Sequence, residues 1–185
     1  MKKSKVVAII PARGGSKRVK NKNIKTFNGL PLIIWTLVEA FKTFEIDDVF
    51  VSTDSKKIIQ IVEYFGFSII KRPLELANDD ASSDVVLLHA LKELGVDSYA
   101  ILAFIQCTNP FENHSTYSSV ISNLIKNKKC SNTFASSKFK GWLWENKGEA
   151  SVGYNHKKEV RKRSQDIDWS LHIERGSIVG IRIPD

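Results

Sequence analysis

Residues 7–23 (VAIIPARGGSKRVKNKN) place a short apolar run directly before a basic loop that contains two glycines. Gly14 and Gly15 allow the backbone to turn closely around a ligand. The cations around that turn are Arg13, Lys17, Arg18, Lys20 and Lys22. Backbone N–H groups and clustered cations suit an anion with several phosphates, although neither a P-loop nor a G-x-G-x-x-G motif is present. The pattern predicts a polyphosphate-binding loop, and the alternative is a solvated basic loop.

The elements that must position this loop follow a regular alternation of short apolar runs and longer amphipathic stretches. The apolar runs predict strands at 6–10, 49–52, 67–71, 99–105, 132–135 and 177–183. Helical spacing predicts helices at 31–44, 55–65, 83–94 and 115–126. Such alternation is typical of a parallel sheet covered on both faces. We therefore expect the α/β class, with a Rossmann-like three-layer architecture and a parallel or mixed sheet.

The ends of these helices carry local signals. Pro31 suits a first-turn position, and Gly66 and Gly95 suit helix stops. Candidate N-terminal caps precede the last two helices: the serine pair Ser82 and Ser83, and the set Asn113, His114 and Ser115. These signals predict helix boundaries to within a few residues.

Segment 136–171 breaks the alternation. It contains Trp142, Trp144, two glycines and many charged residues, and no βα unit fits it. From composition alone it is an irregular β-rich insertion, whose tryptophans favour an intramolecular core over an interface. No other part of the chain departs from the pattern, so we expect a single domain over 1–185 with this one excursion.

The net charge of +8 is compatible with a nucleic-acid partner, a nucleoside triphosphate or a basic surface without a partner. Helix-turn-helix, RNP-like and zinc-finger patterns are not found, so we expect no nucleic-acid partner. No apolar run approaches the ~18 residues of a membrane span, and the first residues lead into a short strand, so we expect no membrane contact and a cytoplasmic location. Cys107 and Cys130 lack metal-site and disulfide spacing, and we expect free thiols.

Four candidate motifs fall at the carboxyl ends of expected strands, where ligands collect in open parallel sheets. They are the loop 13–23, Asp54, the loop 72–83 and the segment 106–110. Each has an alternative interpretation. Asp54 could cap the helix that starts at 55, Ser82 and Ser83 could be caps and nothing else, and the Gln106 amide could satisfy loop backbone.

The segments ARGGSK and KNKNI resemble the opening of the acylneuraminate (CMP-sialic acid) cytidylyltransferases. The similarity continues through NGLPLI at 28–33, VSTD at 51–54, RPLELA at 72–77, ASS at 81–83 and QCTNP at 106–110, and weakens at RKRSQD (161–166) and ERGSI (174–178). The order and spacing of the motifs are specific. Three positions depart from the family pattern: the family's QPTSP is QCTNP here, Ser164 replaces an arginine before Gln-Asp, and Arg175 replaces the asparagine of E-N-G.

The resemblance implies a nucleotide-diphospho-sugar transferase fold and transfer of CMP from CTP to an acidic nonulosonate sugar of the sialic acid type, releasing pyrophosphate. Arg13 and Lys22 would be the catalytic residues. The residues implied for CTP binding are Ala12, Arg13, Gly14, Ser16, Lys17, Asn23, Arg72 and Ser83. The residues implied for the nine-carbon acidic sugar are Gln106, Thr108, Arg163 and Gln165, with Arg161 as a reserve for the sugar carboxylate.

The resemblance further implies Mg²⁺ and a homodimer in which segment 136–171 is the dimerisation arm and lends sugar-binding residues. The family carries a late pair of aspartates for the metal, so we expect a C-terminally shortened relative in which CTP itself or Asp54 holds the ion. The alternative is a shortened or truncated relative that binds CTP or sugar without turnover. A cytidylyltransferase for 3-deoxy-octulosonate is a further alternative, and sialic, legionaminic and pseudaminic acids remain open as substrates.

Overall fold

The computed structural model describes residues 5–16, 19–78, 81–95, 98–148, 150–156, 163–166 and 169–184. The chain divides into two compact units. The first comprises Met1–Ala135 and Gly176–Asp185, and the second comprises Ser136–Arg175. Lys17 and Arg161 of the sequence-based predictions lie outside the described residues.

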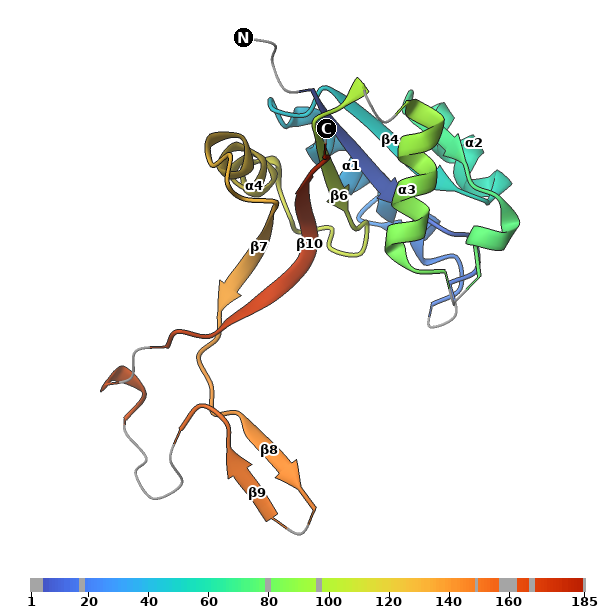
Figure 1. Cartoon of the computed structure of the whole chain (residues 1–185). Helices are drawn as coiled ribbons and strands as arrows, with labels where there is room; N and C mark the ends of the chain where they lie inside the picture. The colour runs from blue at the N-terminus through green and yellow to red at the C-terminus, as the bar shows by residue number, and fades with distance from the viewer. Residues whose placement is uncertain are drawn as a thin grey trace. The chain divides into compact units, whose positions relative to one another are not determined.

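A six-stranded sheet forms the centre of the first unit, in the order β5-β4-β1-β6-β10-β7 (Figure 1). The strands are β1 (Val6–Pro11), β4 (Asp48–Thr53), β5 (Ser68–Lys71), β6 (Ile101–Ile105), β7 (Asn132–Lys138) and β10 (His172–Arg182). β1 pairs in parallel with β4 and β6, and β4 pairs in parallel with β5. β10 runs antiparallel to β6. The sheet is therefore mixed, as predicted.

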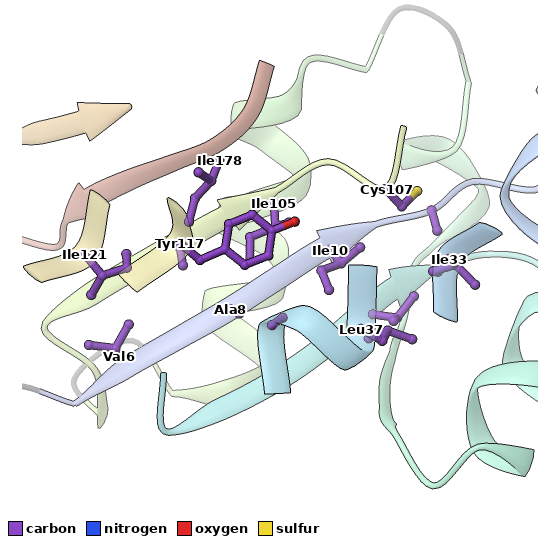
Figure 2. Close-up of a cluster of buried hydrophobic side chains, with 14 of the residues drawn as sticks. Val6, Ala8, Ile10, Ile33, Leu37, Ile105, Cys107, Tyr117, Ile121 and Ile178 are labelled. Carbon is purple, nitrogen blue, oxygen red and sulfur yellow. The ribbon is translucent and has the colours of Figure 1, made fainter. Parts of the chain in front are cut away.

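Four helices connect these strands: α1 (Leu32–Lys42), α2 (Lys56–Tyr64), α3 (Ser83–Leu94) and α4 (His114–Lys126). Val6, Ala8 and Ile10 of β1 pack in a core cluster with residues of α1, α2 and α4, part of which Figure 2 shows. Val7 and Ile9 pack in a second cluster with residues of α3. The two clusters occupy opposite faces because side chains alternate along a strand. The predicted three-layer α/β architecture is confirmed.

The predicted helix signals are mostly confirmed. Asn113 Oδ1 accepts hydrogen bonds from Ser115 N and Thr116 N at 3.1 and 3.2 Å, and Ser82 Oγ accepts one from Val85 N at 3.4 Å. Gly95 ends α3 with a positive φ of 79°. The first-turn prediction for Pro31 is wrong by one position, because α1 begins at Leu32 and Pro31 is its N-cap residue.

Sequence patterns missed several short elements. β2 (Thr26–Phe27) and β3 (Leu30–Pro31) form a two-stranded hairpin. Short 3-10 helices in the described part of the chain were also not predicted: η1 (Lys22–Ile24), η2 (Leu74–Leu76) and η4 (Ser164–Asp166). β10 begins at His172, before the expected start at 177, because the polar residues at its beginning give no apolar strand signal.

The second unit contains the antiparallel hairpin β8 (Trp144–Lys147) and β9 (Ala150–Gly153). Its aromatic rings pack on one another within the unit: the Trp142 ring lies 5.5 Å from that of Trp169 and 4.7 Å from that of His156, between ring centroids. This packing agrees with an intramolecular role for Trp142, whereas Trp144 is 52% exposed. The dimerisation arm stays a prediction. In the described parts of both units, no helix is long and apolar enough to cross a bilayer.

Candidate active site

A cavity of about 590 Å³ opens at the carboxyl ends of β1 and β6. β1 is followed by β4 on one side, and the chain later returns to place β6 on the other side. In open α/β sheets, ligands bind at the carboxyl ends of the strands, at the point where the strand order reverses. The described lining residues are Pro11, Arg13, Ser16, Val19, Lys22, Asn23, Arg72, Leu76, Asn78, Ala81, Ser83, Val86, Phe104, Gln106, Cys107 and Thr108.

The loop after β1 is fixed to the end of β4 through its backbone. Ala12 N donates to Ser52 O at 2.9 Å, and Gly14 N donates to Asp54 Oδ1 at 3.0 Å. A Cβ on Gly14 would lie 2.9 Å from the Cβ of Ser55, so only glycine permits this approach. A Cβ on Gly15 would meet nothing within 4 Å. Of the two glycines, Gly14 is therefore the one that the loop geometry requires.

Asp54 does not cap α2, so that alternative is wrong. The N-cap residue of α2 is Ser55, without a side-chain cap bond, and the Asp54 carboxylate bonds to the Gly14 N–H instead. Across the described residues, no group of three or more His, Cys, Asp or Glu is arranged to hold a metal ion. The role of Asp54 as a metal ligand therefore stays a prediction.

The buried side chain of Asn23 binds the backbone of the basic loop. It lies in η1, is only 5% exposed, and its Nδ2 donates to the Arg13 carbonyl at 3.1 Å. Lys22, the preceding residue, is half-buried in the cavity lining. The Arg13 guanidinium reaches across to Asn78 O at 3.1 Å through Nη1. The loop after β1 thus meets the loop after β5 at the cavity.

Arg72 follows β5 and is 7% exposed. Its Nε donates to Ser52 Oγ at 3.2 Å and its Nη2 donates to Ser52 O at 2.7 Å. Burial lowers the pKa of the guanidinium, and the nearby Asp54 carboxylate opposes that shift. The two hydrogen bonds to Ser52, in β4, therefore fix the orientation of the Arg72 guanidinium.

The end of β6 supplies the opposite wall. Gln106 N donates to Ser177 O of β10 at 2.9 Å, and Gln106 and Thr108 both line the cavity. Between them, Cys107 is buried with its Sγ 3.3 Å from Asn23 Oδ1. Burial raises the pKa of this thiol to about 11, although the Lys22 ammonium acts in the opposite direction.

The structure brings most of the predicted site residues of the first unit into one lining: Arg13, Ser16, Lys22, Asn23, Arg72, Ser83, Gln106 and Thr108. Ala12 is fully buried and lies outside the lining, as does Gly14. Arg163 and Gln165 are exposed in the second unit, where Arg163 Nε donates to Asp166 Oδ2 at 2.8 Å. Their sugar-binding role stays a prediction.

Asn78 and Cys107 line the cavity but were not singled out from the sequence, although they lie in the candidate segments 72–83 and 106–110. Asn78 had a detectable signal, because Asn-Asp-Asp before a helix is typical of a turn. Cys107 had no sequence signal beyond its place in QCTNP. The amino-acid type alone does not predict which polar atom a buried thiol will contact.

The charge of the cavity indicates its ligand class. Arg13, Lys22 and Arg72 contribute three cations, whereas the described lining contains no carboxylate. Apolar side chains of Val86 and Phe104 lie in the same lining. A cationic cavity with an apolar part can take a ligand that carries both phosphates and a planar base.

A family model described as "Cytidylyltransferase" matches residues 7–165. The chain belongs to the cytidylyltransferase family. This confirms the family-level resemblance found in the sequence motifs, and the matched residues include the whole described lining of the cavity.

Individual relatives act on acidic sugars according to their names. An N-acylneuraminate cytidylyltransferase of Escherichia coli is 39% identical over 111 residues, which are 60% of this chain and 26% of the relative. A pseudaminic acid cytidylyltransferase of Campylobacter jejuni is 31% identical over 177 residues, 91% of this chain and 75% of the relative. The chain thus spans about a quarter of the first protein and three quarters of the second.

Among solved structures, the fold is similar to that of CMP:2-keto-3-deoxy-manno-octonic acid synthetase complexed with CTP. The TM-score is 0.73 at 18% identity, and the match covers 97% of this chain and 74% of that chain. A 4-diphosphocytidyl-2C-methyl-D-erythritol synthase from Anaerococcus prevotii matches with a TM-score of 0.66 at 15% identity, over 97% and 70% of the two chains. These similarities support the Rossmann-like nucleotidyltransferase fold of the family.

Proposed function

We propose that this chain binds CTP in the cavity at the ends of β1 and β6 and transfers CMP to an acidic nonulosonate sugar. The observation that carries the proposal is the convergence of Arg13, Lys22 and Arg72 on a cavity whose described lining has no carboxylate. The family match over residues 7–165 supports a cytidine nucleotide as the anionic ligand of this cavity.

In the proposed reaction, a sugar hydroxyl oxygen forms a bond to the α-phosphorus of CTP while the bond from that phosphorus to the bridging oxygen breaks. Pyrophosphate leaves with the electron pair, and the hydroxyl proton passes to solvent. Phosphoryl transfer depends mainly on positioning and on neutralising charge. The proposal assigns Arg13 and Lys22 to the phosphates, and Arg72 and Ser83 to the nucleoside; all four line the same cavity.

Mg²⁺ remains part of the proposal as a companion of the nucleotide. It would arrive on the CTP phosphates, because the described residues offer only Asp54 near the loop and one oxygen of that carboxylate is bonded to Gly14. When bound, the ion would neutralise phosphate charge.

The acceptor is proposed as a nine-carbon acidic sugar. The names of the relatives support this class: N-acylneuraminate, pseudaminic acid and, at 36% identity over 118 residues, N,N'-diacetyllegionaminic acid in a Legionella pneumophila synthase. That last match covers 60% of this chain and 50% of the relative. The proposal assigns contacts with the sugar to Gln106 and Thr108, which both line the cavity.

The test is calorimetric titration of CTP, ATP and UTP with Mg²⁺, followed by pyrophosphate release with a panel of nonulosonates. Wild-type protein should bind CTP selectively and release pyrophosphate with at least one of these sugars. Lys22→Ala should weaken CTP binding by about ten- to hundredfold, because it removes a charge-assisted contact. Lys25→Ala is the matched control, since Lys25 is exposed and lies outside the lining.

Equal affinity for the three nucleotides would contradict the CTP assignment. Selective binding without pyrophosphate release from any acidic sugar would contradict the transfer step while leaving the nucleotide site intact.

A further inference from the structure

The Cys107 thiol occupies an unusual place for a small buried side chain. It is 2% exposed and packs in the core cluster that Figure 2 shows, yet it also belongs to the lining of the cavity. Its Sγ lies 3.3 Å from Asn23 Oδ1 and 4.0 Å from Pro11 O. The thiol therefore stands between the end of β6 and the loop that follows β1.

The direction of each hydrogen bond is fixed by chemistry. Arg13 O is a carbonyl and can only accept, so the Asn23 group that faces it at 3.1 Å is the Nδ2 donor. The Asn23 Oδ1 acceptor is then turned toward Cys107. A thiol can fill the donor position only while it is protonated, and burial raises its pKa to about 11. At neutral pH the bond runs from Sγ–H to Oδ1 and from Nδ2 to Arg13 O.

We infer that Cys107 is a positioning residue, whose thiol orients the Asn23 carboxamide and through it the Arg13 backbone of the phosphate-binding loop. The inference rests on the proposed function, because it assigns that loop to the CTP phosphates. Cys107 acts on the loop through Asn23: the thiol contacts the Asn23 carboxamide, which in turn holds the Arg13 carbonyl. The chain of contacts connects β6 to a loop distant in the sequence.

Simple apolar packing is the competing explanation, and the two make opposite predictions for a pair of substitutions. If packing alone matters, Cys107→Ala should be tolerated better than Cys107→Ser, because serine buries a polar hydroxyl in an apolar cluster. If hydrogen bonding to Asn23 matters, serine keeps a donor and alanine leaves Oδ1 buried without one. The order of the two variants therefore separates the explanations.

The decisive experiment measures CTP affinity by calorimetry for wild type, Cys107→Ser and Cys107→Ala. Alanine should raise the dissociation constant about tenfold, and serine should stay within about threefold of wild type. Cys130→Ala is the matched control, because Cys130 is the other free cysteine and lies outside the lining. Alanine equal to wild type, or serine no better than alanine, would overturn the inference.

A second readout does not depend on nucleotide. Side-chain amide exchange of Asn23, followed by NMR without ligand, should be faster in Cys107→Ala than in wild type and should be restored in Cys107→Ser. Unchanged exchange in the alanine variant would overturn the inference. If wild-type protein failed to bind CTP, the proposed function would fall, whereas this measurement would still decide whether Cys107 orients Asn23.

Discussion

Arg72 is the most buried of the described cations that line the cavity. A guanidinium that is 7% exposed loses most of its hydration, and its two bonds to Ser52 recover only part of that loss. Asp54 lies close enough to affect its pKa, but that carboxylate also accepts from Gly14 N. In the proposed complex, the nucleoside of CTP would supply further hydrogen-bond acceptors to the guanidinium. The side chain is therefore held for binding by contacts that exist before the ligand arrives.

Arg72→Lys should reduce CTP affinity by about tenfold, because an ammonium cannot bond to Ser52 Oγ and Ser52 O in the geometry of a guanidinium fork. Stability should fall by about 1 kcal/mol. Calorimetry and urea denaturation measure the two effects. Arg182→Lys is the matched control: Arg182 Nη2 donates to Leu124 O at 2.6 Å outside the cavity, so this variant should lose stability and keep CTP affinity. Equal CTP affinity in both variants would remove Arg72 from the nucleotide site.

Residue types and motif order predicted which cations and amides would stand at the strand ends, and Arg13, Lys22 and Gln106 do line one cavity. Sequence could not predict the partners of those side chains. The Arg72 contact with Ser52 and the Cys107 contact with Asn23 join residues 20 and 84 positions apart. Such contacts depend on strand order and register, which the amino-acid pattern leaves undetermined.

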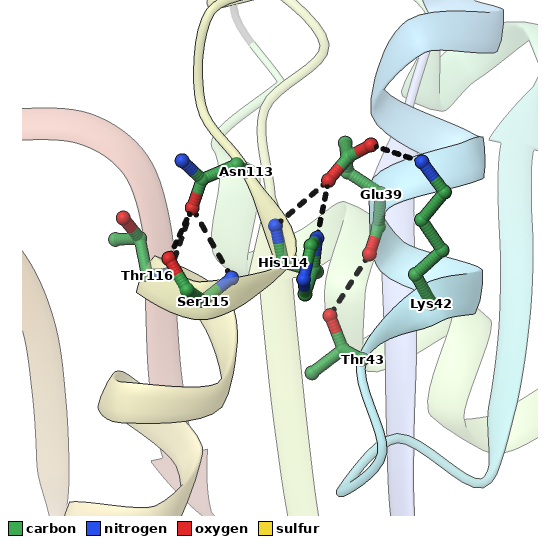
Figure 3. Close-up of polar contacts among 7 residues, drawn as sticks. All are labelled: Glu39, Lys42, Thr43, Asn113, His114, Ser115 and Thr116. Carbon is green, nitrogen blue, oxygen red and sulfur yellow. Dashed lines mark hydrogen bonds and ion pairs between the residues drawn. The ribbon is translucent and has the colours of Figure 1, made fainter.

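Between elements, a polar contact joins α1 to the beginning of α4 (Figure 3). Glu39 Oε2 accepts from His114 N at 2.9 Å and contacts His114 Nδ1 at 2.8 Å, while Oε1 accepts from Lys42 Nζ at 2.8 Å. Burial by itself would raise the pKa of Glu39, but the hydrogen bonds from Lys42 and His114 outweigh it and lower the pKa to about 2. The carboxylate thus stabilises the junction of the two helices when it is ionised.

The Glu39 contact predicts a stability that depends on pH. Because its folded pKa lies below the ordinary 4.5, the contribution is complete above that value and is lost as pH falls toward about 2. Glu39→Gln should lower the free energy of unfolding by about 1–2 kcal/mol at pH 7, after allowance for solvent screening, and by much less near pH 2. Denaturant titrations across this range measure the difference from wild type. Glu93→Gln, at an exposed position of α3, should show no such trend.

A constant difference between Glu39→Gln and wild type from pH 7 to pH 2 would show that the carboxylate charge is not the source of the stability.

Long elements were predictable because their apolar spacing is repeated over several residues. β1, with its near-continuous burial, and α2, with Ile58 and Val62 on its buried side, are examples. The β2–β3 hairpin is too short for periodicity, although Asn28 and Gly29 both have positive φ and Asn-Gly is a strong hairpin signal. Strands β8 and β9 are four residues each and contain no continuous apolar run, so they gave no clear strand signal.

At the scale of the whole molecule, every described residue that lines the cavity belongs to the first unit, whereas Arg163 and Gln165 belong to the second. The family match spans both units, since it runs from residue 7 to residue 165. We therefore propose that the first unit binds the nucleotide and that the second unit contributes to sugar recognition.

Replacing Ser136–Arg175 with a short Asn-Gly turn tests this division. β7 and β10 are neighbours in the sheet, so a tight turn can join what remains of them as a hairpin. The shortened protein should bind CTP within about threefold of wild type, because no described lining residue is removed. Pyrophosphate release with a nonulosonate should fall to background, since Arg163 and Gln165 are absent.

Calorimetry and the release assay measure the two outcomes, and thermal unfolding with CTP should show a ligand-dependent rise in Tm if the first unit is folded. Loss of CTP binding by a folded protein would show that the nucleotide site needs the second unit, and full turnover would show that the sugar site does not.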